Sequence, residues 1–315
     1  MDFKGFNLLV KSEKSALKFV LGKTFKNQQR FCPFCRSRKF WKLADGRRRC
    51  RRCHRVFHDL TGRWWNKVKL PMDDWLRIVK LFELELSARK ISLQTGISYP
   101  TVHKALMVLR YSILTHSNLE QDDNEDDKDS ALSGEIELDE SYFGGRRKGN
   151  RGRGAAGKIP VFGILSRKDG KVSVSVVPDV KAETLLGYAV EKVRRGSIVY
   201  TDKFKAYDSL VFCGYQHLSV DHSGRFSDGK IHTNNIEGFW SWAKERLFKH
   251  HGISPSWFPL YLKELEFRYN HRNGSDLFEI LVGYMSDLIP VTEISERDLS
   301  MTTSTKNQTN AKRSR

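Results

Sequence analysis

Four of the five cysteines stand in two close pairs whose spacing is typical of a metal site. The pattern is C-x2-C-x14-C-x2-C, formed by Cys32, Cys35, Cys50 and Cys53. Each pair can present two thiolates to one ion, and two pairs complete the tetrahedral geometry that Zn²⁺ prefers. Disulfides are the alternative, but they are uncommon inside cells, and the neighbouring arginines and lysines favour thiolates. We predict a structural zinc ion, because four cysteines leave no open coordination position.

Three acidic residues and a lysine form a second pattern that could carry chemistry. Asp139 and Asp202 each stand near the end of a predicted strand, and Glu237 follows Asp202 by 35 positions. Carboxylates from different elements can hold two Mg²⁺ or Mn²⁺ ions, which activate water and stabilise the leaving oxygen of a phosphodiester. Lys244 follows Glu237 by two helical turns and shares its face, where it could hold a DNA phosphate. Taken singly, each acid could instead be a turn, cap or solvated residue.

The elements that must position these acids follow from hydrophobic periodicity over residues 131–290. Strands are expected at residues 135–143, 159–165, 172–177, 197–202 and 217–220. Helices are expected at residues 182–193, 205–210, 231–249 and 255–269. Three strands, a helix, a strand, a short helix, a strand and closing helices form the order of a ribonuclease-H-like fold. The predicted fold class is therefore α/β, with a ribonuclease-H-like catalytic core over residues 131–290.

The net charge of +18 is concentrated in the first quarter of the chain. Residues 1–70 hold 20 Lys and Arg against four Asp and Glu. Such a basic module fits an anionic polymer, and nucleic acid fits better than a membrane because the stretch is not an amphipathic helix. A generic solubilising surface is the alternative. The predicted zinc ribbon, residues 28–62, carries the candidate phosphate contacts Arg48, Arg49, Arg51 and Arg52.

A helix-turn-helix is predicted over residues 70–116, after the ribbon. Apolar residues recur at helical spacing from Met72, Gly96 can cap the middle helix in the left-handed conformation, and Ser98 can begin the next helix. That last helix would enter the major groove of DNA, and a plain helical hairpin is the alternative. Its candidate DNA contacts are Tyr99, Thr101, His103 and Lys104.

Three polar segments complete the expected organisation. Residues 117–130 are predicted to be an acidic linker, because residues 119–130 hold seven acids and one lysine. The glycine-rich loop at residues 146–154 could follow a DNA backbone beside the acids, and a mobile hairpin tip is the alternative. Its candidate DNA contacts are Arg146, Arg147 and Lys148. Residues 291–315 are predicted to be a disordered tail.

Three stretches together resemble a family, the insertion-sequence DDE transposases that carry an N-terminal zinc ribbon. They are ELDESYFGG at 137–145, YTD at 200–202 and HTNNIEGFWS at 232–241. The match, to the ISXO type related to the Merlin-like superfamily, covers about residues 28–275. It implies a ribonuclease-H-like core, Mg²⁺ dependence and terminal inverted repeats as the DNA substrate. It also implies a triad of Asp139, Asp202 and Glu237 with Lys244 as the downstream lysine. Some relatives have Asn at the third position, so Asn235 is an alternative ligand.

The expected function is that of a DNA transposase that binds the terminal inverted repeats of an insertion sequence and catalyses metal-dependent DNA cleavage and strand transfer. Two other classes stay open: a non-enzymatic DNA-binding regulator with a degenerate core, and a nuclease without strand transfer. Expected partners are double-stranded DNA, at the repeats and at the target, and further copies of the chain in a synaptic complex. No stretch approaches 18 uninterrupted apolar residues, so we expect no membrane span and a cytoplasmic, nucleoid-associated protein.

Overall fold

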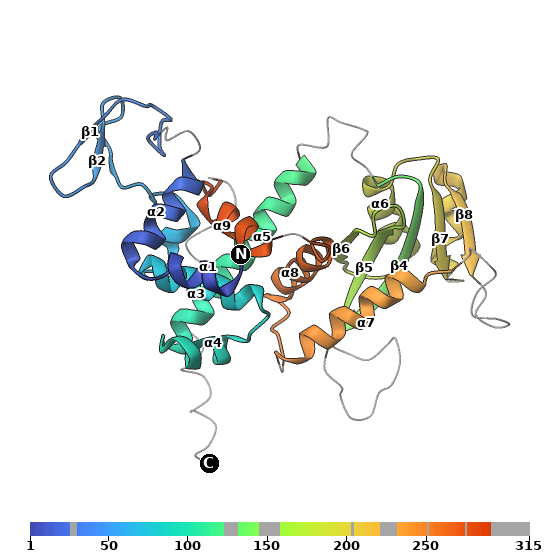
Figure 1. The fold of residues 1–315 in the computed structure, drawn as a ribbon. Coiled ribbons are helices and arrows are strands. Elements are labelled where there is room, and N and C mark those ends of the chain that lie inside the picture. The colour runs from blue at the N-terminus through green and yellow to red at the C-terminus, as the bar shows by residue number, and fades with distance from the viewer. Residues whose placement is uncertain are drawn as a thin grey trace, which may run out of the picture. The chain divides into compact units, whose positions relative to one another are not determined.

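The computed structural model describes residues 1–25, 30–122, 132–144, 158–202, 205–220, 232–250, 252–274 and 276–290. The chain divides into two compact units, one of residues 1–115 with 276–315 and the other of residues 116–275 (Figure 1). The division falls inside the long helix α5 (Tyr99–Asp122). Each unit has its own core and is described by itself.

The N-terminal unit combines helices with a small three-stranded ribbon. Before the ribbon lie α1 (Phe3–Leu9) and α2 (Glu13–Thr24). The antiparallel ribbon has the strand order β1 (Phe40–Lys42), β2 (Arg48–Cys50) and β3 (Val56–Phe57). After it come η2 (Trp64–Lys67), α3 (Met72–Glu83), α4 (Ala88–Thr95) and the first part of α5. The last element, α9 (Leu277–Ser286), belongs to this same unit.

The three helices expected after the ribbon are present at the predicted places. Gly96 ends α4 with a φ of 72°, a left-handed conformation that glycine adopts without strain. The Ser98 carbonyl accepts the first helical hydrogen bond of α5 from the backbone N–H of Val102 at 3.0 Å. Although α5 has 24 residues, none of the helices in the described ranges is both long and apolar enough to cross a membrane.

The second unit is built on one mixed sheet. Its strands, in the spatial order β6-β5-β4-β7-β8, are β4 (Glu135–Phe143), β5 (Ile159–Ser166), β6 (Val172–Val176), β7 (Ile198–Asp202) and β8 (Gln216–Val220). Strand β5 runs in the opposite direction to the other four strands, which are parallel to one another. The helical elements are α6 (Ala182–Lys192), η3 (Lys205–Cys213), α7 (Asn234–Phe248) and α8 (Phe258–Asn270). All strands and helices expected in this region therefore form within a few residues of their predicted bounds.

Alternation along the strands gives the sheet two different faces. Ile136 and Leu138 of β4 pack with Leu185 of α6 in one apolar core. Phe143 and Val161 pack with helices α7 and α8 in another core on the opposite face. Figure 1 shows α6 on one side of the sheet and α7 with α8 on the other. Residues of β4 with odd numbers therefore point toward α7, and residues with even numbers point toward α6.

The structure differs from two predicted domain bounds. Residues 117–122, predicted as the start of an acidic linker, are the last turns of α5, because a helix extends readily once it has formed. Residues 123–131 lie outside the described residues. Residues 276–290, predicted as part of the catalytic domain, pack instead on the N-terminal unit. There the Phe278 ring contacts Phe6 and Phe19, an apolar contact between distant parts of the chain.

Candidate active site and metal centre

Asp139 and Asp202 stand at the same level of two neighbouring parallel strands. β4 pairs with β7 at a constant offset of 63 positions, with Glu137 beside Tyr200 as the last pair. The same offset carried on by two residues places Asp139 beside Asp202, the final residue of β7. Because side chains alternate between the two faces of a strand, both aspartates point to the face that α7 covers. The sheet therefore brings two acids that are far apart in sequence together under one helix.

The surroundings of Asp139 disfavour its charged form. Burial raises the pKa of Asp139 to about 7, and the negative charges of Glu140 and Asp202 add to the rise. The indole of Trp240 on α7 donates its Nε1–H to Asp139 Oδ2 at 3.0 Å, and this hydrogen bond lowers the pKa of Asp139. Asp139 is half-buried, and a partly buried carboxylate beside other acids binds a cation favourably because the cation offsets both the burial and the repulsion. Asp139 and Asp202 therefore fit as ligands of a hard divalent ion.

Gly163 makes room for the Trp240 ring. Gly163 lies on β5 directly opposite Asp139 in the antiparallel pair. A Cβ atom at this position would lie 2.5 Å from Trp240 Cζ2 and 3.1 Å from Ile236 Cδ1. Glycine inside a strand often marks such a close approach. Any larger residue at position 163 would displace the indole and break its hydrogen bond to Asp139.

Glu237 and Lys244 lie on α7, three positions before and four positions after Trp240, so the three side chains share a helix face. Both Glu237 and Lys244 are exposed. The Thr233 hydroxyl donates to Glu237 Oε1 at 3.0 Å. Although Lys244 is exposed as a whole, partial burial lowers its pKa, and the negative charge of Asp139 opposes this shift. In the described part of the chain no acid belongs to a group of three or more arranged to hold a metal, so Glu237 is not gathered with the two aspartates.

Asn235, the alternative third ligand, is turned toward a different carboxylate. Its Nδ2 donates to Glu137 Oε1 at 2.8 Å, and its backbone N–H donates to Glu137 Oε2 at 3.1 Å. Glu137 is completely buried. The Asn235 side-chain amide is therefore occupied by Glu137 in this structure.

The four cysteines already stand as a metal site, since their Sγ atoms all lie within 4.8 Å of one another. The two cysteine pairs share one backbone pattern. The N–H of Arg36 donates to the Cys32 carbonyl at 2.9 Å, and the N–H of His54 donates to the Cys50 carbonyl at 3.1 Å. Arg36 and His54 also share a positive φ, 59° and 58°. This repetition is the two-knuckle geometry that the spacing predicts.

The donor set fits Zn²⁺ by its chemistry. Backbone N–H groups of Cys53 and Arg52 lower the pKa of Cys50 to about 6, although burial opposes them, whereas burial raises the pKa of Cys32 to about 12. Bound Zn²⁺ would favour the thiolate form of all four cysteines. The ribbon's own core consists of the buried Cys32, Cys50 and Phe57 with a few half-buried neighbours. So small a core needs the free energy of metal binding to fold. The site is therefore structural.

The ribbon separates the four candidate phosphate contacts into two kinds. Arg49, Arg51 and Arg52 are exposed. Arg48 is buried, because side chains alternate along β2 and its neighbours point outward. Its guanidinium forms an ion pair of 2.5 Å with Asp59 and lies over the Phe40 ring. Arg48 therefore stabilises the ribbon rather than presenting its charge to solvent, which differs from the prediction.

The candidate DNA contacts at the start of α5 are accessible to different degrees. Tyr99 is 51% exposed, whereas Thr101, His103 and Lys104 are half-buried. The His103 ring lies 5.9 Å from that of Tyr99, and burial followed by the charge of Arg110 lowers the pKa of His103. His103 therefore favours its neutral form and would contribute hydrogen bonds rather than charge. Arg146, Arg147 and Lys148 lie outside the described residues.

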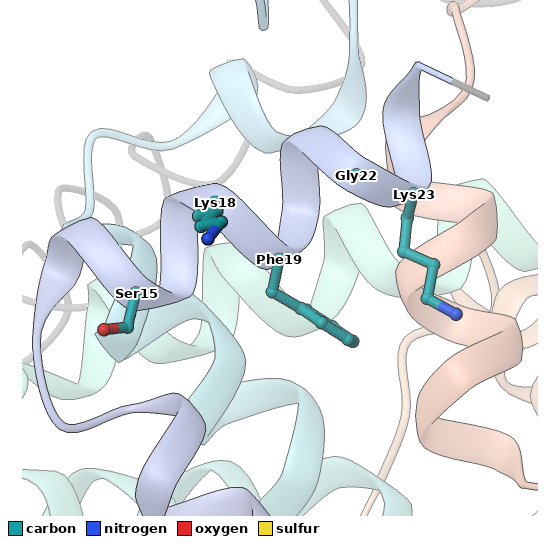
Figure 2. A pocket seen from close by; sticks show the side chains of 5 residues that line it. All are labelled: Ser15, Lys18, Phe19, Gly22 and Lys23. Atoms are coloured by element: carbon teal, nitrogen blue, oxygen red, sulfur yellow. The ribbon is translucent and has the colours of Figure 1, made fainter. Parts of the chain in front are cut away.

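A hollow of about 510 Å³ lies along α2 in the N-terminal unit. It is lined by Ser15, Lys18, Phe19, Gly22 and Lys23 (Figure 2). Figure 2 shows Phe19 and Lys23 extending from the helix on the same side. The Lys23 ammonium is already paired with Glu279 at 2.6 Å. The five residues that line the hollow therefore include no acid–base pair for chemistry.

Sequence reasoning missed three residues that shape the acid site. Gly163 carries a usable signal, because an isolated glycine inside a strand pattern indicates a close approach. Trp240 lies three positions after Glu237, which places it on the face of that acid, but its periodicity equally fits a core residue. Glu137 stands in the same short motif as Asp139 and is indistinguishable from its neighbours by type. Its partners on α7 lie 98 and 99 positions away, and Arg167 lies 30 positions away.

Comparison with known proteins agrees with this organisation. Residues 11–56, which contain the four cysteines, match a transposase zinc-ribbon domain, and residues 131–270 match an ISXO2-like transposase domain. An uncharacterized transposase-like protein of Haemophilus influenzae is 42% identical over 111 residues, which cover 35% of this chain and 90% of that protein. An uncharacterized protein in transposable element ISH50 of Halobacterium salinarum is 26% identical over 262 residues, which cover 76% of this chain and 84% of that protein. The chain belongs to the ISXO2-like transposase family with an N-terminal zinc ribbon.

Proposed function

We propose that the chain binds the terminal inverted repeats of its own insertion sequence, cuts DNA there, and joins the ends to target DNA. The observation that carries this proposal is the position of Asp139 beside Asp202 on the sheet face under α7. Membership of a transposase family supports DNA as the substrate. A regulator with a degenerate core would not need two neighbouring acids. It would also not need to keep Asp139 half-buried, where its charged form is disfavoured.

The order of the strands supports a ribonuclease-H-like core for this unit. Numbered along the chain, the five strands lie in the spatial order third, second, first, fourth, fifth, and only the second is antiparallel. The first and fourth strands are neighbours, and each carries one aspartate on the face that α7 covers. This arrangement is the one implied by the resemblance to DDE transposases.

Asp139, Asp202 and Glu237 are the residues that would hold Mg²⁺ or Mn²⁺. Bound there, the ions would supply charge neutralisation at the phosphodiester and a more acidic attacking water. Trp240 fixes the orientation of the Asp139 carboxylate through its hydrogen bond. Lys244 extends from the same helix face and would hold a DNA phosphate beside the acids. Glu237 would complete the site from a rotamer that it does not occupy in this structure.

The N-terminal unit would supply DNA binding. The zinc ribbon, residues 28–62, would grip the phosphate backbone through Arg49, Arg51 and Arg52. Helices α3 to α5 would act as a helix-turn-helix, residues 70–116, with the start of α5 in the major groove. Arg146, Arg147 and Lys148, which follow β4 in the sequence, would add contacts to the DNA backbone.

Two element ends must be joined to one target, so we expect further copies of the chain to associate on DNA. The test uses full-length protein and a labelled duplex that ends in the element's own repeat, with a target plasmid. Mg²⁺-dependent nicking at the repeat, followed by transfer of the label to the plasmid, supports the proposal. Nicking without transfer would indicate a nuclease, and specific binding with neither reaction would indicate a regulator.

A further inference from the structure

A second carboxylate, Glu137, lies on the α7 face of β4 only two positions before Asp139. Glu137 is completely buried, yet four hydrogen-bond donors surround it. Its Oε2 accepts from the backbone N–H groups of Asn235 at 3.1 Å and Ile236 at 3.0 Å. Its Oε1 accepts from Asn235 Nδ2 at 2.8 Å and from Arg167 Nε at 2.7 Å. The donors come from the first turn of α7 and from the end of β5.

These contacts anchor the N-terminus of α7 to the strand that carries Asp139. The first N–H groups of a helix have no partner inside the helix, and they carry the positive end of the helix dipole. The N-cap residue of α7, Thr233, makes no side-chain hydrogen bond to them. The carboxylate of Glu137 satisfies two of these N–H groups from a different element. A buried acid therefore takes the place of a local cap.

Arg167 joins the same anchor from the other side. In addition to Glu137, its guanidinium donates to the carbonyl of His232, just before α7. It also lies 3.7 Å from the centre of the Tyr200 ring on β7. The arginine thus connects the start of α7 with both strands that carry the aspartates. The positive charge of Arg167 and the helix dipole compensate the buried charge of Glu137.

Glu137 and Asp139, on the same face of β4, therefore have opposite electrostatic surroundings. The charge of Glu137 is compensated by the protein, whereas burial and neighbouring acids act against the charge of Asp139. Glu137 is the group that sets where α7 begins, and Glu237, Trp240 and Lys244 follow at fixed helical positions. A shift at the start of α7 would move all three relative to Asp139 and Asp202.

We propose that Glu137 is a positioning residue of the transposase: it anchors the start of α7 so that Glu237 and Lys244 face Asp139 and Asp202. This inference rests on the proposed function, because it concerns the geometry of the same metal site. A merely structural role would lower the stability of the fold but leave the affinity of folded protein for metal unchanged. The two roles are therefore separated by measuring metal binding in addition to activity.

The test compares Glu137→Gln with the control Glu135→Gln in full-length protein. The glutamine side chain offers one carbonyl oxygen to four donors, so the anchor of α7 is weakened while the size of the side chain is kept. Glu135 lies on the same face of β4 and contacts Arg167 at 3.1 Å and the Tyr200 hydroxyl at 3.2 Å. Mn²⁺ binding is followed by the electron paramagnetic resonance signal of the free ion, and nicking and unfolding are measured on the same preparations.

We expect Glu137→Gln to weaken Mn²⁺ binding and to slow nicking by about 10- to 100-fold, the usual scale for groups that support metal ligands. DNA binding should be unchanged, and Glu135→Gln should resemble the wild type in both measurements. Arg167→Lys keeps the charge but cannot reach both Glu137 and His232, so a smaller loss in the same direction is expected. That variant carries the test if Glu137→Gln fails to fold.

Different results would overturn the proposed function and the positioning role of Glu137. A wild-type protein that neither binds Mn²⁺ nor nicks the element-end duplex would overturn the proposed function. Wild-type nicking together with normal Mn²⁺ affinity and normal nicking in Glu137→Gln and Arg167→Lys would overturn the positioning role alone. A lower unfolding temperature with unchanged metal affinity would likewise assign Glu137 to stability only.

Discussion

The cysteine site and the acid site of this transposase are built in opposite ways. Two knuckles with the same backbone pattern hold four Sγ atoms within 4.8 Å of one another. The three acids come instead from two strands and a helix, and in the described residues they are not gathered to the same extent. One site is assembled by local turns within 22 residues, and the other depends on the packing of distant elements.

The difference reflects what each site has to do. A closed set of four thiolates leaves no room for substrate, so its metal holds a small ribbon together. A site for phosphodiester chemistry must admit DNA and water, so its acids cannot surround the ion completely. Asp139 illustrates the consequence, because burial and nearby acids raise its pKa to about 7.

Glu237→Gln should reduce nicking of an element-end duplex by several orders of magnitude, because the charge that would complete the metal site is lost. Asn235→Ala serves as the matched variant, since Asn235 stands two positions away with its amide turned toward Glu137. It should lose much less activity. Nicking rates at saturating Mg²⁺ decide between them. Full nicking by Glu237→Gln and none by Asn235→Ala would make Asn235 the third ligand.

Cys35→Ser should remove zinc and unfold the ribbon while leaving the catalytic unit folded. Zinc binding supplies on the order of 10 kcal/mol in comparable small domains, so the ribbon cannot compensate for a lost ligand. Metal analysis of the wild type should find about one zinc per chain, and DNA binding by the variant should fall. The control is Cys213→Ser in η3, which should keep both. Zinc-free wild-type protein with a folded ribbon would contradict the assignment.

Asp139→Asn should stabilise the protein when divalent cations are omitted. The pKa of Asp139 is raised from 3.8 to about 7 in the folded state. Ionisation of Asp139 therefore destabilises the fold, by an amount that increases from about pH 4 to about pH 7 and is constant at higher pH. The gain should be on the order of 4 kcal/mol at pH 8 and smaller at pH 5.5. Urea unfolding at the two pH values measures the difference. An equal gain at both would exclude a charge effect.

Arg49→Ala and Arg48→Ala should have different effects, although the two residues are adjacent. Arg49 is exposed, so its loss should weaken binding to all DNA and reduce the slope of affinity against salt by about one. Arg48 is buried against Asp59, so its loss should mainly lower the stability of the ribbon. DNA titrations at several salt concentrations separate them. The same change in salt slope for both would place Arg48 on the DNA.

Much of the acid site could be predicted from sequence because alternating or consecutive apolar residues mark β4 and β7 as strands. Asp202 ends β7 as expected, whereas Asp139 lies in the middle of β4 rather than near its end. The two aspartates nevertheless stand at matching positions of neighbouring strands. The spacing of Glu237 and Lys244 on one helix also holds, since α7 spans both. Local periodicity was sufficient for these features.

Other features depend on contacts that no local pattern encodes. Helix α9 lies in the N-terminal unit because Phe278 packs on Phe6 and Phe19, which are more than 250 positions away. The role of Glu137 depends in the same way on the start of α7. The burial of Arg48 follows from strand alternation in β2, but a strand of three residues is too short to recognise by periodicity.

The central claim is that Asp139 and Asp202 together form a metal-dependent active site, and Asp202→Asn tests it most directly. Binding and nicking of the labelled element-end duplex are measured on one sample in Mg²⁺, Mn²⁺ or Ca²⁺. Wild-type protein should nick with Mg²⁺ and Mn²⁺ and bind with little nicking in Ca²⁺, whose bonds are longer and whose geometry is looser. The variant should bind normally and nick several orders of magnitude more slowly. Undiminished nicking by Asp202→Asn would contradict the account.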